Sequence, residues 1–386
     1  MKILIYTSFI TERCLERRAS DQYISSAGQK KVLLLARALE SLGHAVDICS
    51  TSFAKSFDRP FLEDISSRVR VIHAPTLGLF GRASLFKKTV GTAFNIYWLV
   101  GHYKEYQIVI FYNFHVEFAV PSLVARRVFG LEIVMDYEDG LFDDKGYQSS
   151  FYRYLEKAVY RGATGFILVN AGLKERIRLF GQAEKPIVVI NGFFDTHLLE
   201  ENRDSRIGPG LKIAFTGNFN RGFGFSELIQ YVNHWPKDFT LTITGRAGAE
   251  EEGILRSCVK DQPNISFKGF LGTREFETLL AEIDIYILLN SPGSDSNKTN
   301  FPSKLFDYLS RNCLVLSTPN PTLKPYYPLR NFLLLGDFPD DLKRIREMCK
   351  DLRPDADELF SLHNDIVHSL ARFLHKVTSS RQYPRG

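Results

Sequence analysis

Short apolar runs alternate with amphipathic segments along most of the chain, an order that is typical of parallel α/β sheets. In the first half the runs predict strands at 2–6, 45–49, 69–73, 107–111, 131–136, 165–169 and 186–190. In the second half, strands at 211–216, 239–244, 264–267, 284–289 and 313–317 alternate with helices at 226–233, 250–259 and 273–282. The pattern predicts an α/β protein of two doubly wound, Rossmann-like domains.

The alternation is interrupted at 195–210, where charged residues and a Gly-Pro-Gly replace the apolar periodicity. We therefore divide the chain into an N-terminal domain, 1–195, and a second domain, 211–355. The remaining segment, 356–386, has apolar residues along one side of a helix, and it either completes the second domain or packs back on the first. Because ligands of such sheets gather at the C-terminal strand ends, we expect the two domains to face each other across a cleft.

The most informative stretch is 301–312, FPSKLFDYLSRN, where a polar loop turns abruptly into a helix. Pro302 fits the first helical turn, because its missing N–H costs nothing there. The amides of residues 303–305 would then point at a ligand, and the helix dipole favours an anion. Lys304 adds a full positive charge at the same place. The stretch therefore predicts an anion site at the start of this helix.

Asp307 lies one turn after Ser303 and shares its face of the helix. A carboxylate beside a phosphate site is repulsive unless it accepts hydrogen bonds, for example from the hydroxyl pair of a sugar. The amides, Lys304 and Asp307 together predict a nucleotide, with its diphosphate on the helix start and its ribose on Asp307. The alternative is that Lys304 lies in solvent and Asp307 only complements the helix dipole.

Length and composition limit the class of protein. With 386 residues, 44% of them apolar and 24% charged, the chain suits a soluble globular protein of two ordinary domains. Its net charge of +5 is mild and scattered, so we expect no nucleic-acid partner. The five cysteines lie far apart, which predicts neither a disulfide framework nor a zinc site. Since the sequence shows no signal peptide or membrane-spanning run, we expect a cytoplasmic location, at most peripheral on the inner face of a membrane.

Several stretches resemble those of one known family. The second half carries INGFFD at 190–195, FTGNFNRGFGFSELI at 215–229, FKGFLGTREFETLLAEIDIYILLN at 267–290 and FPSKLFDYLSRNCLVLST at 301–318. They resemble, in this order, the donor-binding half of retaining nucleotide-sugar glycosyltransferases of the GT-B fold, glycosyltransferase family 4. The first half is similar more loosely, through SSAGQKKVLLLARALESLGHAVDI at 25–48 and EKAVYRGATGFILVN at 156–170.

The resemblance implies roles for basic residues of the second domain. Arg221 matches a residue that holds the donor diphosphate, and Asn218 stands where the family usually has a second basic residue. Lys304 or Arg246 would supplement Arg221, because a diphosphate without enough positive charge around it would be costly to bind. The alternative for Arg221 is a turn residue in a glycine-containing loop.

The family also has two glutamates separated by seven residues around the same helix. Asp307 matches the second, the ribose contact, and Thr299 stands where the first would meet the transferred sugar. Backbone groups at Gly269 and Phe270 resemble the segment that holds the base. Gly28 resembles the glycine whose amide approaches the diphosphate from the other domain, although glycine is also common at helix starts.

Candidate acceptor residues follow two predicted strands of the first domain. Asp136, Glu138 and Asp139 come at the C-terminal end of one strand, and His115 follows the strand before it. Neighbouring carboxylates raise one another's pKa and can bind acceptor hydroxyls or help a proton leave. We assign the three carboxylates to catalysis, Asp139 first, and His115 to the acceptor. A single histidine more often has a structural role.

Segment 84–106 combines apolar and aromatic residues with Lys87, Lys88 and Lys104, a composition that suits a helix at a membrane interface. Such a helix would bring the protein into peripheral contact with a membrane that carries a lipid-linked acceptor. The alternative, which is the more common, is a helix that packs on the core and keeps one wet side.

The resemblance implies a retaining glycosyltransferase of the hexosyltransferase type. It would move a sugar from a nucleotide-diphosphate sugar to a glycan or lipid-linked acceptor, in the synthesis of a cell-surface polysaccharide or glycolipid, with no metal and no cofactor besides its substrate. Two alternatives stay open: a nucleotide-sugar epimerase or hydrolase of the same fold, and a non-enzymatic, degenerate transferase subunit that binds a nucleotide or a partner. A dinucleotide dehydrogenase is disfavoured, because no Gly-x-Gly-x-x-Gly follows the first strand.

Overall fold

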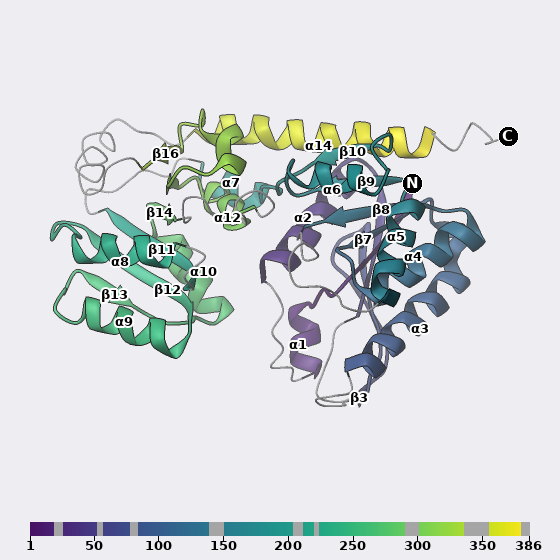
Figure 1. Ribbon diagram of the computed structural model, residues 1–386, viewed down its shortest axis with the longest axis horizontal. Coiled ribbons are helices and arrows are strands. Elements are labelled where there is room, and N and C mark those ends of the chain that lie inside the picture. Colours follow the sequence, from purple (N-terminus) through teal and green to yellow (C-terminus); the bar gives the residue numbers. More distant parts are fainter. Residues whose placement is uncertain are drawn as a thin grey trace. The chain divides into compact units, whose positions relative to one another are not determined.

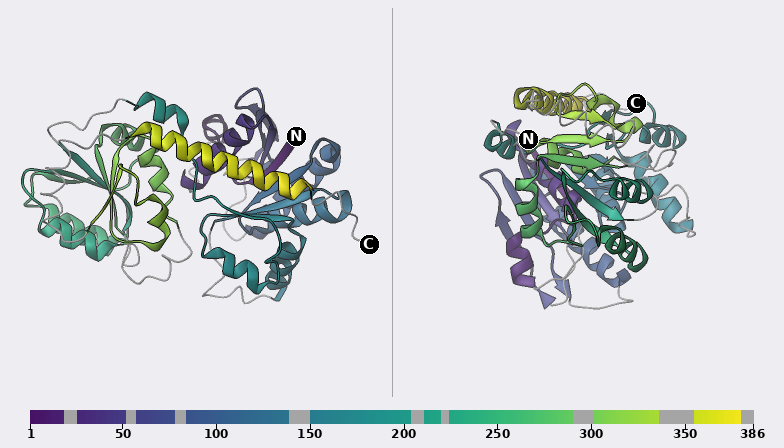
Figure 2. Two further views of the ribbon diagram at one scale, coloured as in Figure 1. Left: turned by 90° about the horizontal axis from the view of Figure 1, so that it is seen from above. Right: turned by 90° about the vertical axis from the view of Figure 1, so that its left-hand side faces the viewer.

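The computed structural model describes residues 1–18, 26–51, 57–77, 84–138, 150–203, 211–219, 224–289, 301–335 and 355–379. The chain forms two compact units (Figures 1 and 2). Unit 1 comprises Met1–Phe193 together with Asp365–Gly386, and unit 2 comprises Phe194–Asn364. The first unit therefore includes the last segment of the chain as well as the first.

Unit 1 is built on a sheet whose described strands follow the order β10-β9-β8-β7-β1-β2-β5-β4. The predicted strands are present and parallel, whereas β4 is an antiparallel edge strand on β5. The sequence does not predict β4, because its FLED carries two acids, nor the two-residue strands β3 and β6. The strands are β1 (Lys2–Thr7), β2 (Ala45–Ser50), β3 (Phe57–Asp58), β4 (Phe61–Asp64), β5 (Val69–His73), β6 (Thr76–Leu77), β7 (Ile108–Tyr112), β8 (Glu132–Tyr137), β9 (Gly165–Leu168) and β10 (Ile187–Val189).

Helices cover both faces of this sheet, as expected for a doubly wound fold. On one face, apolar residues of α2 and α14 share a core with the strand residues Ile3, Ile5 and Ile110. On the opposite face, the Tyr6 hydroxyl donates a hydrogen bond to the Asn95 carbonyl of α3. The helices are α1 (Glu12–Arg18), α2 (Ser26–Ser41), α3 (Ser84–His102), η2 (Tyr103–Glu105), α4 (Val116–Phe129), α5 (Ser150–Gly162), α6 (Leu173–Leu179) and α14 (Ala356–Ser379). The sequence predicts most of them but not the highly charged α1.

The second half of α14 packs on unit 1 beside strand β9. A Cβ atom on Gly165 would lie 2.8 Å from both Phe373 and Val377, so the helix approaches the strand closely only because residue 165 has no side chain. Val377 and Phe373 are buried in the same core as the strand residue Ile167. The last part of the chain thus contributes to the hydrophobic core of unit 1.

Unit 2 has a parallel sheet in the order β13-β12-β11-β14-β15-β16. Ile285 and Ile287 face the core that α8 and α9 cover, and Tyr286 between them stacks on Tyr308 of α12 on the other face. The strands are β11 (Lys212–Phe219), β12 (Thr240–Ala247), β13 (Ile265–Phe267), β14 (Ile285–Leu288), β15 (Leu314–Ser317) and β16 (Phe332–Leu334). The helices are α7 (Thr196–Glu201), α8 (Phe225–Asn233), α9 (Ala249–Val259), α10 (Thr273–Glu282), α12 (Lys304–Leu309) and η3 (Pro321–Tyr326).

Candidate functional site

Strand β11 and helix α12 are joined by a hydrogen bond at one edge of the unit 2 sheet. Thr216 lies toward the carboxyl end of β11, and Lys304 is the first residue of α12. The Lys304 Nζ donates a hydrogen bond to Thr216 Oγ1 at 3.0 Å. The predicted lysine therefore lies at the C-terminal edge of the sheet, where doubly wound folds bind their ligands.

Lys304 is a half-buried ammonium group that lies 5.7 Å from the centroid of the Phe276 ring. Burial lowers the pKa of Lys304 to about 8, and the negative charge of Asp307 partly opposes this shift. Within the described part of the chain, no carboxylate oxygen comes within the 4.0 Å of an ion pair with its Nζ. A desolvated cation in this state is costly, and an anionic ligand would supply the missing negative charge.

Thr216 is itself fixed by Tyr308, because the two hydroxyl groups form a short hydrogen bond. The Tyr308 ring stacks on Tyr286 with 3.8 Å between ring centroids and 1° between ring planes. Burial raises the pKa of Tyr308 well above its ordinary value, so the phenol stays protonated. Lys304, Thr216 and Tyr308 thus form one hydrogen-bonded chain from the buried face of the sheet to its edge.

Helix α12 is shorter than the sequence predicts. It spans Lys304–Leu309, whereas the sequence suggests a start at Pro302 and an end near Asn312. The Leu305 amide donates to the Pro302 carbonyl at 2.9 Å, so this amide is occupied and the expectation that it binds a ligand is wrong. Asn312 has a φ of 55°, a left-handed conformation that ends the helical turns.

Ser303 and Asp307 complete the predicted set on this helix. Ser303 is exposed at the N-cap position, and its side chain makes no capping hydrogen bond among the described residues. Asp307 is half-buried one turn later. Ser303 thus remains accessible at the start of α12, and Asp307 influences Lys304 through its charge.

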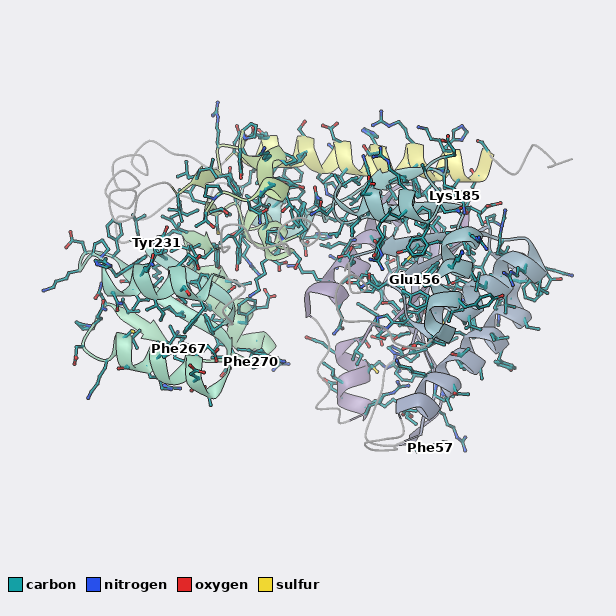
Figure 3. All side chains as sticks on the ribbon, viewed as in Figure 1. Phe57, Glu156, Lys185, Tyr231, Phe267 and Phe270 are labelled. Atoms are coloured by element: carbon teal, nitrogen blue, oxygen red, sulfur yellow. The ribbon has the colours of Figure 1, made fainter. Side chains whose placement is uncertain are left out.

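Arg246 and Phe270 lie at the neighbouring strand ends. The guanidinium carbon of Arg246 is 4.4 Å from the centroid of the Phe270 ring, and Phe270 is 64% exposed (Figure 3). The turn before Phe270 contains Gly269, with a φ of +63°, whose carbonyl accepts hydrogen bonds from the Thr244 hydroxyl at 2.7 Å and the Gly245 amide at 2.9 Å. A planar cation against an exposed ring offers a stacking surface for a nucleobase.

In unit 1, Asp136 and Glu138 lie at the carboxyl end of β8, and both pair with Lys31 of α2. The Lys31 Nζ is 2.9 Å from Asp136 Oδ1 and also contacts Glu138 Oε1. Asp136 is 1% exposed and Lys31 9%. The Asp136 Oδ2 atom is buried and accepts no hydrogen bond from the described residues. Of the three predicted carboxylates, Asp136 and Glu138 thus lie close together, with a lysine between them that sequence reasoning missed.

His115 and Gly28 flank the same edge of the unit 1 sheet. His115 is the N-cap residue of α4, and its ring meets the edge of Phe118 with 5.5 Å between centroids. Asn113, two residues earlier, receives a hydrogen bond from the Glu138 amide at 2.7 Å, which ties this loop to the end of β8. Gly28 lies in the first turn of α2, one turn before Lys31. Gly28 therefore lies on the helix that carries Lys31, and His115 follows a loop that is hydrogen-bonded to the end of β8.

Four predicted residues fall wholly or partly outside the described part of the chain. Asp139 and Arg221 lie outside it, and so does Thr299. Asn218 is described through its backbone, which pairs in register with Arg246 of β12. The roles given to these residues stay predictions.

Residues 27–192 match the family model of the glycosyl transferase 4-like domain. This match covers most of the N-terminal part of unit 1. The resemblance inferred from the sequence is thereby confirmed for this part of the chain. Among curated proteins, none matches the sequence significantly.

Solved structures extend the similarity beyond the glycosyl transferase 4-like domain to nearly the whole chain. Sucrose-phosphate synthase from Thermosynechococcus elongatus has a TM-score of 0.63 at 13% identity, over 98% of this chain and 100% of that chain. HepE from Anabaena, in complex with UDP and glucose, has a TM-score of 0.59 at 14% identity, over 98% and 100%. The lipopolysaccharide outer core galactosyltransferase WaaB has a TM-score of 0.58 at 12% identity, over 97% and 99%. The predicted GT-B fold, with two Rossmann-like sheets, is confirmed.

Three residues of these sites are absent from the sequence-based set. Thr216 and Tyr308 carry no motif of their own, and their link to Lys304 depends on contacts between residues 88 and 92 positions apart. Lys31 stands three residues after Gly28 in a helix with several other basic residues, so its pairing with carboxylates has no sequence signal. None of the helices described is both long and apolar enough to cross a bilayer.

Proposed function

We propose that the chain is a retaining glycosyltransferase that moves a sugar from a nucleotide-diphosphate sugar to a glycan or lipid-linked acceptor. The observation that carries this proposal is the half-buried Lys304 ammonium, fixed by Thr216 at the C-terminal edge of the unit 2 sheet. Its charge would meet the diphosphate, Asp307 would accept hydrogen bonds from the ribose hydroxyls, and the base would stack on Arg246 and Phe270. The family match of residues 27–192 supports the same reaction class.

The proposed reaction breaks the bond between the sugar's anomeric carbon and the donor diphosphate. An acceptor hydroxyl forms the new bond on the same face, and its proton passes to a phosphate oxygen of the departing diphosphate. Negative charge therefore builds on the diphosphate, where Lys304 and the exposed start of α12 would stabilise it. Loss of one such donor typically raises the barrier by about 3 kcal/mol, or roughly a hundredfold in rate. No metal ion or additional cofactor has a part in this scheme.

The carboxylates of unit 1 would serve the acceptor. Asp136 and Glu138, with their charge compensated by Lys31, would accept hydrogen bonds from acceptor hydroxyl groups. Asp136 Oδ2, which has no hydrogen-bond partner among the described residues, supports this role, because a buried carboxylate oxygen gains most from a hydroxyl donor. We keep Asp139 as the first candidate for assisting proton departure and His115 as an acceptor contact.

The nucleotide is best sought among uridine diphosphates. HepE was solved with UDP and glucose, and a UDP-GlcNAc 2-epimerase from Neisseria meningitidis, with a TM-score of 0.51 at 13% identity, was solved with UDP-GlcNAc. UDP-sugars are therefore the first donors to test. The transferred sugar, the acceptor and a place in surface polysaccharide or glycolipid synthesis are part of the proposal.

We also propose that α3 (Ser84–His102) brings the protein into contact with the inner face of a cytoplasmic membrane. Tyr97 is 74% exposed and Val100 is 53% exposed, one turn apart on its outer side, whereas Leu99 packs into the core. Exposed aromatic and aliphatic residues on one helix favour insertion at an interface. Co-sedimentation with anionic liposomes at low salt tests this contact. The double variant Tyr97→Ser/Val100→Ser should abolish it.

A nucleotide-sugar epimerase is the second candidate, because two UDP-GlcNAc 2-epimerases share the fold, with TM-scores of 0.51 and 0.52. The two functions differ in their need for an acceptor. Nucleotide release from UDP-sugars, measured with and without glycan and polyprenyl-phosphate acceptors, should require an acceptor, and the product should keep the donor's anomeric configuration by NMR. Turnover without any acceptor would favour the epimerase or a hydrolase, and nucleotide binding without turnover would favour a degenerate subunit. Lys304→Ala or Asp307→Ala at the wild-type rate would show that the site is wrongly assigned.

A further inference from the structure

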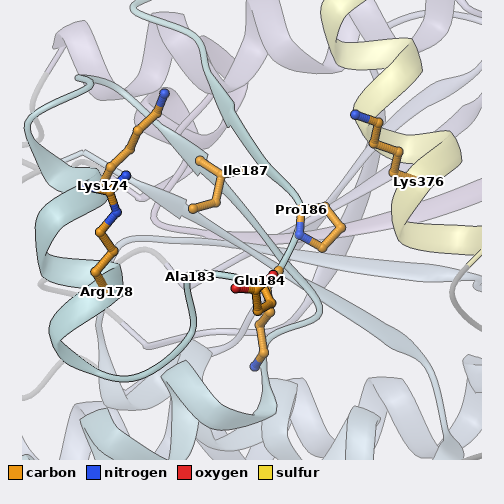
Figure 4. Close-up of a pocket in the computed structure, with 8 residues that line it drawn as sticks. Lys174, Arg178, Ala183, Glu184, Pro186, Ile187 and Lys376 are labelled. Atoms are coloured by element: carbon orange, nitrogen blue, oxygen red, sulfur yellow. The ribbon is translucent and has the colours of Figure 1, made fainter.

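A pocket of about 440 Å³ in unit 1 is lined mainly by basic side chains. It lies beside strand β10, with Lys174 and Arg178 of α6 on one wall and Lys376 of α14 on the other (Figure 4). Lys185, in the loop before β10, is a fourth cation of the lining. Among the described residues that line the pocket, Glu184 is the only acidic one. The pocket therefore combines a concave shape with an excess of positive charge.

The cations of this pocket are weakly compensated. Arg178 meets Glu175 of its own helix at 3.3 Å, but both side chains are well exposed, so this ion pair contributes little. For Lys174 and Lys376, no ion pair is found in the described part of the chain. Lys185 cannot swing away, because its Nζ donates to two carbonyl groups at the end of α5, at 2.9 and 2.7 Å. A concave surface with an excess of charge of one sign concentrates counter-ions.

The floor of the pocket supplies a second feature that favours an anion. Strand β10 is an edge strand, paired on one side with β9. The Pro186 carbonyl accepts a hydrogen bond from β9, and the Ile190 amide donates one to it. In a parallel ladder, the backbone groups of successive residues point alternately to the two sides of a strand. The amides of Ile187 and Val189 therefore point to the open edge. Backbone amides beside lysine and arginine side chains are the donor set that binds phosphate groups.

We propose that this pocket binds a phosphate-bearing anion. The ligand is a compact phosphate or diphosphate group, either on a soluble molecule or as the headgroup of an anionic phospholipid. Its oxygens accept hydrogen bonds from Lys174, Arg178 and Lys376 and from the amides at the edge of β10. This site is separate from the donor site proposed on unit 2, since all of its lining residues belong to unit 1.

Two binding experiments distinguish the sources of the phosphate. Isothermal titration calorimetry with inorganic pyrophosphate measures the soluble ligand, and co-sedimentation with phosphatidylglycerol vesicles, against phosphatidylcholine vesicles, measures the headgroup. The test variant is Lys174→Gln/Arg178→Gln/Lys376→Gln. The matched control removes two lysines and one arginine from other exposed positions, as Lys237→Gln/Arg127→Gln/Lys260→Gln, so that the net charge falls equally.

We expect the pocket variant to lose about tenfold or more of the affinity in at least one arm, because three charge-assisted contacts are removed. The control variant should stay within about twofold of wild type. Loss in the pyrophosphate arm alone identifies a soluble ligand, and loss in the vesicle arm identifies a headgroup. Equal losses in pocket and control variants overturn the proposal, as does wild-type binding by the pocket variant in both arms. The variant Lys304→Ala reports on the donor site separately. The pocket does not bind phosphate if Lys304→Ala abolishes pyrophosphate binding while the pocket variant keeps wild-type binding of both pyrophosphate and vesicles.

Discussion

The lowered pKa of Lys304 predicts that nucleotide binding weakens as the pH rises. Burial lowers this pKa from 10.5 to about 8. The protonated fraction of such a lysine is about 0.9 near pH 7 and about 0.1 near pH 9. If only the ammonium form binds the diphosphate, affinity falls about tenfold between these pH values, or about 1.4 kcal/mol. A lysine with an ordinary pKa would stay charged at both.

Calorimetric titration with a nucleoside diphosphate between about pH 7 and pH 9 measures this directly. In buffers of different ionisation enthalpy, the same titrations should reveal proton uptake that grows with pH, since the ligand restores the ammonium form. Lys304→Arg is the matched variant, because the guanidinium keeps its charge throughout and its binding should be flat over this range. An affinity that stays within about twofold in the wild type, or that falls equally in Lys304→Arg, would refute the reasoning.

Three further variants test other parts of the structure. Lys31→Met leaves two buried carboxylates without their cation and should destabilise the protein by about 3–5 kcal/mol in urea unfolding, whereas a loss below about 1 kcal/mol would contradict the ion pairs. Gly165→Ala places a Cβ atom against two side chains of α14, so it should lower the free energy of unfolding by about 1–3 kcal/mol and expose that helix to proteolysis. The control Gly101→Ala, where a Cβ atom meets no neighbouring atom, should leave the stability unchanged. Thr216→Val removes the hydroxyl that accepts a hydrogen bond from the Lys304 ammonium, so the pKa of Lys304 should drop further. Nucleotide binding should then weaken at a lower pH than in the wild type, where the midpoint is about pH 8. An unchanged pH profile would count against that contact.

Most of the fold follows from the apolar pattern, because strands buried on both faces produce continuous apolar runs. The runs at 108–112 and 285–288 are of this kind, and each is a central strand. Two elements do not show this pattern: β4 has two acids among its four residues, and α1 carries five charges in seven residues. The start of α12 differs from prediction because Pro302 accepts a hydrogen bond as a turn residue instead of joining the helix.

The candidate sites were only partly predictable, because sequence motifs report single positions and the sites depend on pairs. Lys304 and Asp307 are found from a helix start, but the role of Thr216 requires β11 and α12 to meet at one edge of the sheet. Asp136 is found as an acid at a strand end, whereas Lys31 is one of several basic residues in α2 until that helix packs beside β8. Sequence periodicity cannot choose among neighbouring lysines, since any of them could face solvent.

The central claim is that the unit 2 edge around Lys304 binds the diphosphate of a nucleotide. A thermal-shift panel of UDP, GDP, dTDP and CDP on wild type, Lys304→Gln and the surface control Lys260→Gln tests it most directly. At 100 times its dissociation constant, a bound nucleotide should stabilise the wild type and Lys260→Gln by about 2.7 kcal/mol, with most of the shift lost in Lys304→Gln. A panel in which no nucleotide raises the melting temperature, or in which Lys304→Gln responds as fully as wild type, would contradict the account.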